Sequence, residues 1–333
     1  MTAADADRPL ARSLFPLDAA DFRPHPLHAG DRTWTETNCY VDVWIEVLHA
    51  LGLEPLAASA FTLSAGFEGD QWTFFKFPPE DLRRVFGLEV AELNVWKPVL
   101  DHVLEQLDLG RLCTVEADSW FLPDTRGDSY HEVHVKSTVV PQMVDVEGRR
   151  LGYFHNAGYF ELDGDDFDGV FQRGSHADPT KLPPYVEVIR IDRLLDDDAG
   201  LVGRAVALTR EHLARRAGDN PITEMSAGLR RDLPWLAGED LETFHLYAFG
   251  TCRQCGASNE LAASFVDWLN EYDRPGTGSA AEDLRAVAEG AKALQFALAR
   301  VARGRRADLE SILSPMAERW ERALRTLECR YGR

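Results

Sequence analysis

The chain has 333 residues, of which 45% are hydrophobic, and its formal net charge is -19. A chain of this length predicts two domains, or one domain with a large extension. The net negative charge argues against nucleic acid as a partner, because displacing counterions from phosphates requires clustered Lys and Arg. It also disfavours binding to an anionic membrane surface.

The cysteines and the first residues bear on the compartment. Five cysteines form an odd, sparse set, unlike a disulfide framework. The opening MTAADADRPLARSLFPL lacks the basic and apolar regions of a signal peptide. No apolar run approaches the roughly 18 residues that a membrane span needs. We therefore expect a cytoplasmic protein that does not associate with membranes.

The first segments along the chain are a lead-in and a helix. Residues 1–30, rich in Pro, Asp and Ala, predict an irregular lead-in. After Thr37 or Asn38, either of which can cap a helix, apolar residues recur at helical spacing: Val41, Trp44, Ile45, Leu48 and Leu51. Gly52 stands where helices commonly end. Cys39 is therefore predicted in the first turn of this helix.

The remainder predicts a sheet followed by helices. Residues 79–88 and 95–110 read as short helices, and the apolar pattern then changes to the period of strands in segments 111–123, 131–146, 149–162 and 184–191. A hairpin is expected to turn at Glu147-Gly148. Helical patterns follow in 200–217, 239–272, 279–303 and 305–330. We expect an α+β domain over 31–195, in which a helix packs on an antiparallel sheet, and an all-α bundle over 196–333.

Cys39 is the first candidate for chemistry. A helix N-terminus carries partial positive charge and unpaired N–H groups, which favour a thiolate and can hold an oxyanion. A thiolate also needs a base. His134 stands on the more polar side of the strand predicted over residues 131–140, and His131, on the other side, is the weaker candidate. A buried inert cysteine and a structural histidine remain the alternatives for these residues.

A catalytic imidazole needs a group that fixes its tautomer. Asn156 follows His134 by 22 residues, on the returning strand of the expected hairpin, where antiparallel strands bring positions side by side. The alternatives are Asp118 and Asp124, or a turn-forming role for Asn156 before Ala157-Gly158.

The segments TNCYVDVWIEVLHALG, DSWFLPDT, YHEVHVKS and LGYFHNAGYFEL resemble a bacterial family known only as a domain of unknown function. The pattern also resembles the butirosin-biosynthesis acyltransferase and the bacteriocin-processing cysteine peptidases, which share a papain-like fold. In those enzymes a Cys opens a helix, a His follows on a strand, and an Asp or Asn follows one hairpin later. The matching positions are Cys39, His134 and Asn156. A helical domain follows the catalytic one in the butirosin type, and the pattern of residues 196–333 predicts one here.

The resemblance implies a cysteine-dependent acyl- or aminoacyltransferase without a cofactor, whose donor is an acyl carrier protein and whose acceptor is a small amine. Thr33 stands where the peptidases commonly carry an oxyanion-binding Gln, with Asn38 nearby. This departure disfavours peptide hydrolysis more than acyl transfer. A cysteine peptidase or amidase, and a non-catalytic binding protein that keeps the fold, are the alternative functions. Further candidates for oxyanion or substrate binding are Trp34, Asp124, His131 and His155.

Two metal candidates are set aside. Cys252 and Cys255 form a C-x-x-C that no second pair follows, in a helical stretch. His131 and His134 are three residues apart on an expected strand, where they point to opposite faces. We therefore expect no metal site.

Overall fold

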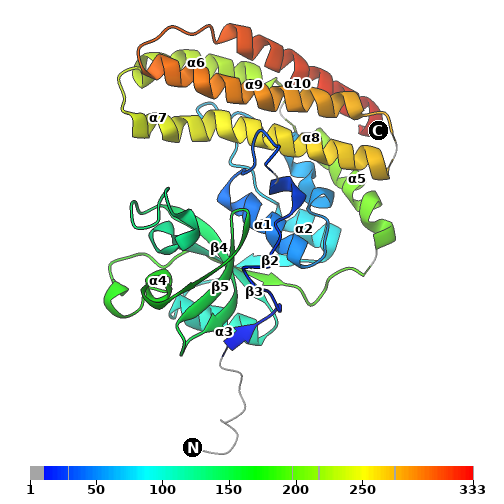
Figure 1. Cartoon of the computed structure of the whole chain (residues 1–333). Coiled ribbons are helices and arrows are strands. Elements are labelled where there is room, and N and C mark those ends of the chain that lie inside the picture. Colours follow the sequence, from blue (N-terminus) through cyan, green and yellow to red (C-terminus); the bar gives the residue numbers. More distant parts are fainter. Residues whose placement is uncertain (1–10, 29, 197, 217, 274, 333) are drawn as a thin grey trace, which may run out of the picture. The chain divides into compact units, whose positions relative to one another are not determined.

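The computed structural model (Figure 1) describes residues 11–28, 30–196, 198–216, 218–273 and 275–332. The chain forms two compact units. The first unit comprises residues 1–26, 39–53 and 82–195. The second comprises residues 27–38, 54–81 and 196–333. Two segments that precede residue 82 thus belong with the C-terminal helices, although the sequence boundary was expected at 195/196.

The first unit is built on one sheet whose strand pairs are all antiparallel. The strand order is β2-β7-β3-β4-β5-β6, and β1 pairs with β4. The strands are β1 (Ala11–Ser13), β2 (Glu89–Glu92), β3 (Leu112–Asp118), β4 (Lys136–Asp145), β5 (Arg150–His155), β6 (Gly158–Asp163) and β7 (Val186–Arg190). The helices are α1 (Cys39–Ala50), α3 (Val99–Asp108) and α4 (Gly164–Val170), with short 3-10 turns η3 (Ser119–Phe121), η4 (Pro123–Thr125) and η5 (Gly174–His176). An antiparallel sheet followed by helices confirms the expected α+β class.

Strand β4 organises the sheet. Its first residues pair with β3, its last residues pair with β1, and β5 runs along almost all of it. The ladder between β4 and β5 shifts by one residue between Pro141 and Met143, which forms a β-bulge. Proline has no backbone N–H to donate to a ladder, so it is commonly found at such bulges. The β4–β5 turn lies at residues 146–149, so the hairpin expected at Glu147-Gly148 is confirmed.

Three sequence expectations about strands were wrong. The strand expected over 131–140 begins only at Lys136, and residues 131–135 form a turn and an extended approach to it. The strand expected over 149–162 is two strands, β5 and β6, with a turn between them. The irregular lead-in includes β1 within its described part; residues 1–10 and 29 of that lead-in lie outside the described residues.

Helix α1 begins at Cys39, as expected, and Gly52 follows it with φ 72°, the left-handed conformation that ends helices. It packs against β4, β5 and β6. Residues 40–48 are all buried, including Asp42 and Glu46, so this helix is enclosed on every side rather than along one stripe. The Glu46 carboxylate accepts the backbone N–H of His25 at 3.1 Å.

The second unit is helical. Its elements are η1 (Pro26–His28), η2 (Pro55–Ser64), α5 (Asp198–Arg215), α6 (Pro221–Leu236), α7 (Leu241–Ala248), a π-helical turn η6 (Phe249–Arg253), α8 (Gln254–Tyr272), α9 (Gly278–Ala302) and α10 (Glu310–Tyr331). Helix α9 contacts both α8 and α10 (Figure 1). The turn η2 contacts α5 and α8. The helical region expected over residues 196–333 is confirmed, although the sequence did not predict α6. Helix α2 (Pro79–Phe86) begins in the second unit and ends in the first. No described helix is both long and apolar enough to cross a bilayer.

Candidate functional site

Cys39 lies at the first position of α1, directly over the sheet. Its Sγ is 3.8 Å from the hydroxyl of Thr138 on β4, and the side chain is partly buried. The N–H groups that open a helix have no partner within it and give its N-terminus a partial positive charge. The contact with Thr138 defines one face of the sheet, which we call the α1 face.

Strand register places four polar residues together on the α1 face. Thr138 pairs with Glu116 across the β3–β4 ladder, and Lys136 pairs with Asp118. Side chains alternate along a strand, so these four share a face. The Lys136 ammonium donates to Glu116 at 2.6 Å. A row of charged and hydroxyl groups therefore leads from Cys39 to the start of β4.

His134 lies beyond the end of that row. Its Nδ1 is 2.6 Å from the Asp118 carboxylate, and its ring stacks on Trp120 with centroids 4.5 Å apart. The side chain is 62% exposed. His134 makes no hydrogen bond to Cys39 in the described part of the chain, and it precedes Thr138 by four residues, a backbone span of at most roughly 13 Å. The structure thus pairs His134 with Asp118, one of the orienting groups that the sequence left open.

A buried network fixes the start of α1. The hydroxyl of Tyr40 donates to Glu187 on β7 at 2.9 Å, and Thr114 and Tyr185 donate to the same carboxylate. Burial and the charge of Glu187 raise the pKa of Tyr40, so this hydroxyl stays a donor. Since a buried carboxylate with three donors is costly to disturb, the network holds Cys39 over β4.

Asn156 lies in the turn between β5 and β6, not on a strand beside His134. Its φ is 43°, in the left-handed region that asparagine tolerates. The paired residues on either side are His155 and Gly158. Asn156 therefore occupies the turn-forming alternative, and no described hydrogen bond joins its side chain to an imidazole.

The expected oxyanion donors belong to the second unit. The backbone N–H groups of Thr33 and Trp34 donate to Glu260 at 2.9 and 2.7 Å, and the Trp34 indole donates to the carbonyl of Ala288. The amide of Asn38 donates to the carbonyl of Phe75 at 3.1 Å. These groups serve the packing of that unit.

A cavity of about 550 Å³ adjoins His134. We call it the histidine cavity, and its lining includes Trp120, Phe121, His131, His134, Asp165, Gly169, Ser175, His176, Ala177, Asp178 and Lys181. His131 Nε2 lies 3.4 Å from Asp166, and its ring stacks on Tyr130 with centroids 4.1 Å apart. This volume lies in the range of small-molecule sites. The cavity therefore brings His131 and His134 to one surface, although its three histidines form no metal-binding group among the described residues.

Two family models match the chain and meet close to the boundary between residues 195 and 196. The model of the DUF1839 N-terminal domain matches residues 23–191, and that of the DUF1839 C-terminal domain matches residues 198–329. The chain belongs to the DUF1839 family. No curated protein matches it.

In this DUF1839 chain, Asp124 and His155 form a second carboxylate–imidazole pair, inside the first unit. The Asp124 carboxylate is 2.6 Å from His155 Nδ1 and accepts the Tyr153 hydroxyl at 2.5 Å. The Ser137 hydroxyl is 2.6 Å from His155 Nε2. Register places Ser137 and His155 on the face opposite α1, because Val139, two residues after Ser137, pairs with His155. Sequence reasoning named Asp124 and His155 but missed Ser137.

A similar chain of contacts occurs in the helical unit. His212 Nε2 is 2.7 Å from Asp81, and His212 Nδ1 is 2.8 Å from the hydroxyl of Ser64. Both imidazoles are buried, with His155 1% and His212 3% exposed. A nucleophile must face a cleft, and neither serine lines a cavity described for these units. We therefore interpret both Ser–His–Asp chains as internal hydrogen-bond networks that satisfy buried polar groups.

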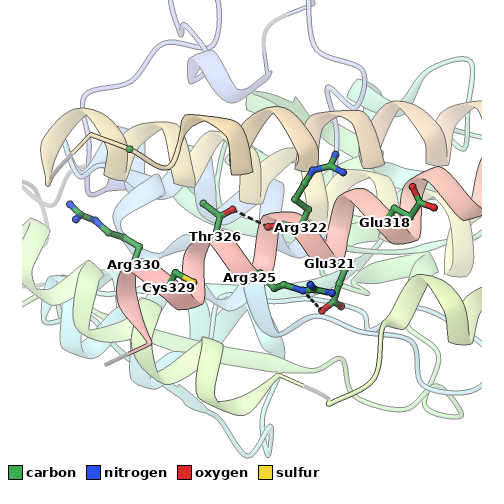
Figure 2. A pocket seen from close by; sticks show the side chains of 8 residues that line it. Glu318, Glu321, Arg322, Arg325, Thr326, Cys329 and Arg330 are labelled. Atoms are coloured by element: carbon green, nitrogen blue, oxygen red, sulfur yellow. Dashed lines mark hydrogen bonds and ion pairs between the residues drawn. The ribbon is translucent and has the colours of Figure 1, made fainter.

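A groove of about 800 Å³ runs along α10 (Figure 2). Figure 2 shows Cys329 near the C-terminal end of α10, and a pair formed by Arg325 and Glu321. The two side chains of this pair are 3.0 Å apart. Arg322 pairs with Asp283 of α9. Because these two guanidinium groups already have carboxylate partners, we assign the groove no ligand. The exposed thiol of Cys329 serves as a reference for the rate of cysteine alkylation.

Thiol labelling should distinguish the five cysteines of the DUF1839 chain. Burial raises the pKa of Cys113 and Cys252 to about 12 and that of Cys255 well above its usual value. At pH 8 a thiol of pKa 12 is about one part in ten thousand thiolate. We expect iodoacetamide to modify Cys39 and Cys329 in the folded protein, as read by peptide mass spectrometry. Rapid labelling at Cys252 would contradict the buried C-x-x-C.

Proposed function

We propose that the DUF1839 chain is a papain-like cysteine acyl- or aminoacyltransferase whose nucleophile is Cys39. The observation that carries the proposal is the position of Cys39 at the N-terminus of α1, on the sheet face that also bears Asp118 and the imidazole it orients. A thioester on an acyl carrier protein is the proposed donor, and a small amine is the proposed acceptor.

In this mechanism the Cys39 thiolate adds to the thioester carbonyl, and the N–H groups that open α1 stabilise the oxyanion. The C–S bond to the donor breaks, and the donor leaves as a thiol with the proton that His134 took from Cys39. The amine then attacks the acyl-cysteine and gives its proton to His134. The bond between the acyl carbon and Cys39 Sγ breaks, the product leaves as an amide, and the Cys39 thiolate takes the proton back from His134. Asp118 holds the imidazole tautomer in both steps.

The distance from Cys39 to His134 is the demanding part of this mechanism. Catalytic hydrogen bonds are often long in a structure without substrate, and they close in the complex. The imidazole is exposed and precedes the first strand residue, so the mechanism requires residues 131–135 to bring His134 toward Cys39. Base removal is therefore the sharpest test of the proposal.

We expect wild-type protein to gain one acyl group from octanoyl-N-acetylcysteamine, by intact mass, and Cys39→Ala to gain none. The measurement uses a Cys329→Ser background, which removes the exposed thiol. His134→Ala should slow adduct formation by about 100-fold or more. His245→Ala, which removes an exposed imidazole of α7 that does not line the histidine cavity, is the control. An adduct of equal size on Cys39→Ala would overturn the nucleophile, and an unchanged rate for His134→Ala would overturn the base.

A non-catalytic binding protein is the second candidate function, because the polar neighbour of Cys39 is a threonine hydroxyl and not an imidazole. This candidate requires an ordinary thiol. The rate of iodoacetamide labelling at Cys39 against pH separates the two, since a midpoint near about 8.5 favours binding and a midpoint well below it favours catalysis. If acyl-Cys39 forms, its loss to water rather than to an added amine would indicate a hydrolase.

A further inference from the structure

A second cavity adjoins the histidine cavity and differs from it in chemistry. It has a volume of about 370 Å³, and we call it the apolar cavity. Most of its lining is aliphatic, aromatic or proline: Val95, Pro98, Val99, Val170, Phe171, Ala177, Pro179, Pro183 and Pro184. Ala177, Asp178 and Lys181 line both cavities. The two spaces are therefore neighbouring compartments that share the wall formed by residues 177–181.

Two nitrogen groups at the shared wall and beside it have no hydrogen-bond partner. The Lys181 ammonium makes no ion pair or hydrogen bond with any residue that the structure describes, and it is exposed. His176 Nε2 is buried and makes no hydrogen bond, although it lies 3.0 Å from Asp165. A buried polar atom without a partner is rare and calls for a ligand or water.

The nearby carboxylates make no hydrogen bond to these donors. Asp178 accepts the backbone N–H and the hydroxyl of Thr180, and these bonds, with a smaller effect of the Lys181 charge, lower the pKa of its carboxyl. Asp165 is 76% exposed to solvent. Lys97, the other lysine at the apolar cavity, is paired with Glu105. Lys181 is therefore the lysine at this wall that can bind an incoming anion.

We propose that the two compartments together bind an aliphatic carboxylate, with its head at Lys181 and His176 and its chain in the apolar cavity. The observations that carry it are the shared wall, the unpartnered donors on the polar side, and the aliphatic lining on the other. The inference rests on the proposed function only in naming the class of acyl group that the site near His134 receives. Binding needs no acyl transfer, so the two can fail separately.

The test is isothermal titration of the full chain, carrying Cys39→Ala, with sodium butanoate, hexanoate, octanoate and decanoate. Each buried methylene should raise the affinity about fourfold until the apolar cavity is full. Lys181→Ala should weaken every carboxylate by about tenfold or more. Lys136→Ala, a lysine of β4 that lines neither cavity, should leave the affinities unchanged.

Val99→Trp tests the apolar compartment separately, because Val99 is half-buried at the start of α3 and the larger ring would fill the cavity. It should abolish the gain per methylene and leave butanoate binding intact. Octylamine should bind about tenfold more weakly than octanoate, or weaker still. A flat chain-length series, equal binding by Lys181→Ala, or octylamine as tight as octanoate would each overturn the proposal.

Discussion

Asp124→Ala is expected to lower the free energy of unfolding by about 2–6 kcal/mol, because two buried donors each lose their acceptor at a cost of about 1–3 kcal/mol. The Asp124 side chain is 4% exposed and His155 is 1% exposed. Without the carboxylate, both the His155 Nδ1–H and the Tyr153 hydroxyl lose an acceptor in the interior. Burial already raises the pKa of Tyr153, so its proton cannot leave to relieve the loss.

Asp118→Ala is the matched control, because Asp118 and His134 have the same 2.6 Å separation at an exposed position. The exposed pair contributes up to about 1 kcal/mol. Asp118 also caps η3 by accepting the backbone N–H of Trp120, which adds about 1 kcal/mol. Urea unfolding followed by circular dichroism should therefore give a loss of about 1–2 kcal/mol for this variant. Equal losses of unfolding free energy in the two variants would contradict the prediction, because they would show that water satisfies the donors that Asp124 leaves.

The sequence predicted the features that depend on neighbours along the chain. The start of α1 at Cys39 follows from capping residues before an apolar helical pattern, and its end follows from Gly52. The turn at residues 146–149 follows from Glu147-Gly148 between two strand patterns. In each case the residues that decide the structure lie within a few positions of it.

The sequence did not predict features that depend on pairing with residues far along the chain. Residues 131–135 have the same apolar-polar alternation as β4, but the ladder begins only at Lys136, where Asp118 of β3 pairs with it. The side chain of His134 therefore has the environment of a loop. The Ser137–His155 contact depends on the β4–β5 register, since neither residue carries a local signal for the other.

Asn156 shows how a single residue divides one predicted strand into two. The pattern from 149 to 162 alternates as one strand would, yet Asn156-Ala157 turns the chain back on itself and pairs His155 with Gly158. Asparagine accepts a positive φ more readily than most residues. As a result, Asn156 does not lie beside His134, and the carboxylate that contacts this imidazole is that of Asp118.

Gly87→Ala is expected to lower the free energy of unfolding by about 2–5 kcal/mol, the sum of a backbone cost and an overlap cost. Gly87 follows α2 with φ 80°, where a side chain costs about 1–2 kcal/mol. A Cβ at this position would lie 2.1 Å from the carbonyl oxygen of Arg193 and 3.2 Å from the backbone nitrogen of Leu195. Relieving that overlap moves backbone and adds about 1–3 kcal/mol.

The overlap falls on backbone that is itself hydrogen-bonded, which is why a small adjustment cannot remove it. The Leu195 N–H donates to the carbonyl of Phe86 at 2.9 Å, next to Gly87. Gly52→Ala isolates the backbone cost, because Gly52 has φ 72° and a Cβ added there would meet no atom within 4 Å. Both glycines lie in the first unit, so one urea transition reports on both. Gly87→Ala should be the less stable variant by about 1–3 kcal/mol, and equal losses would mean that residues 193–195 leave the end of α2 at little cost.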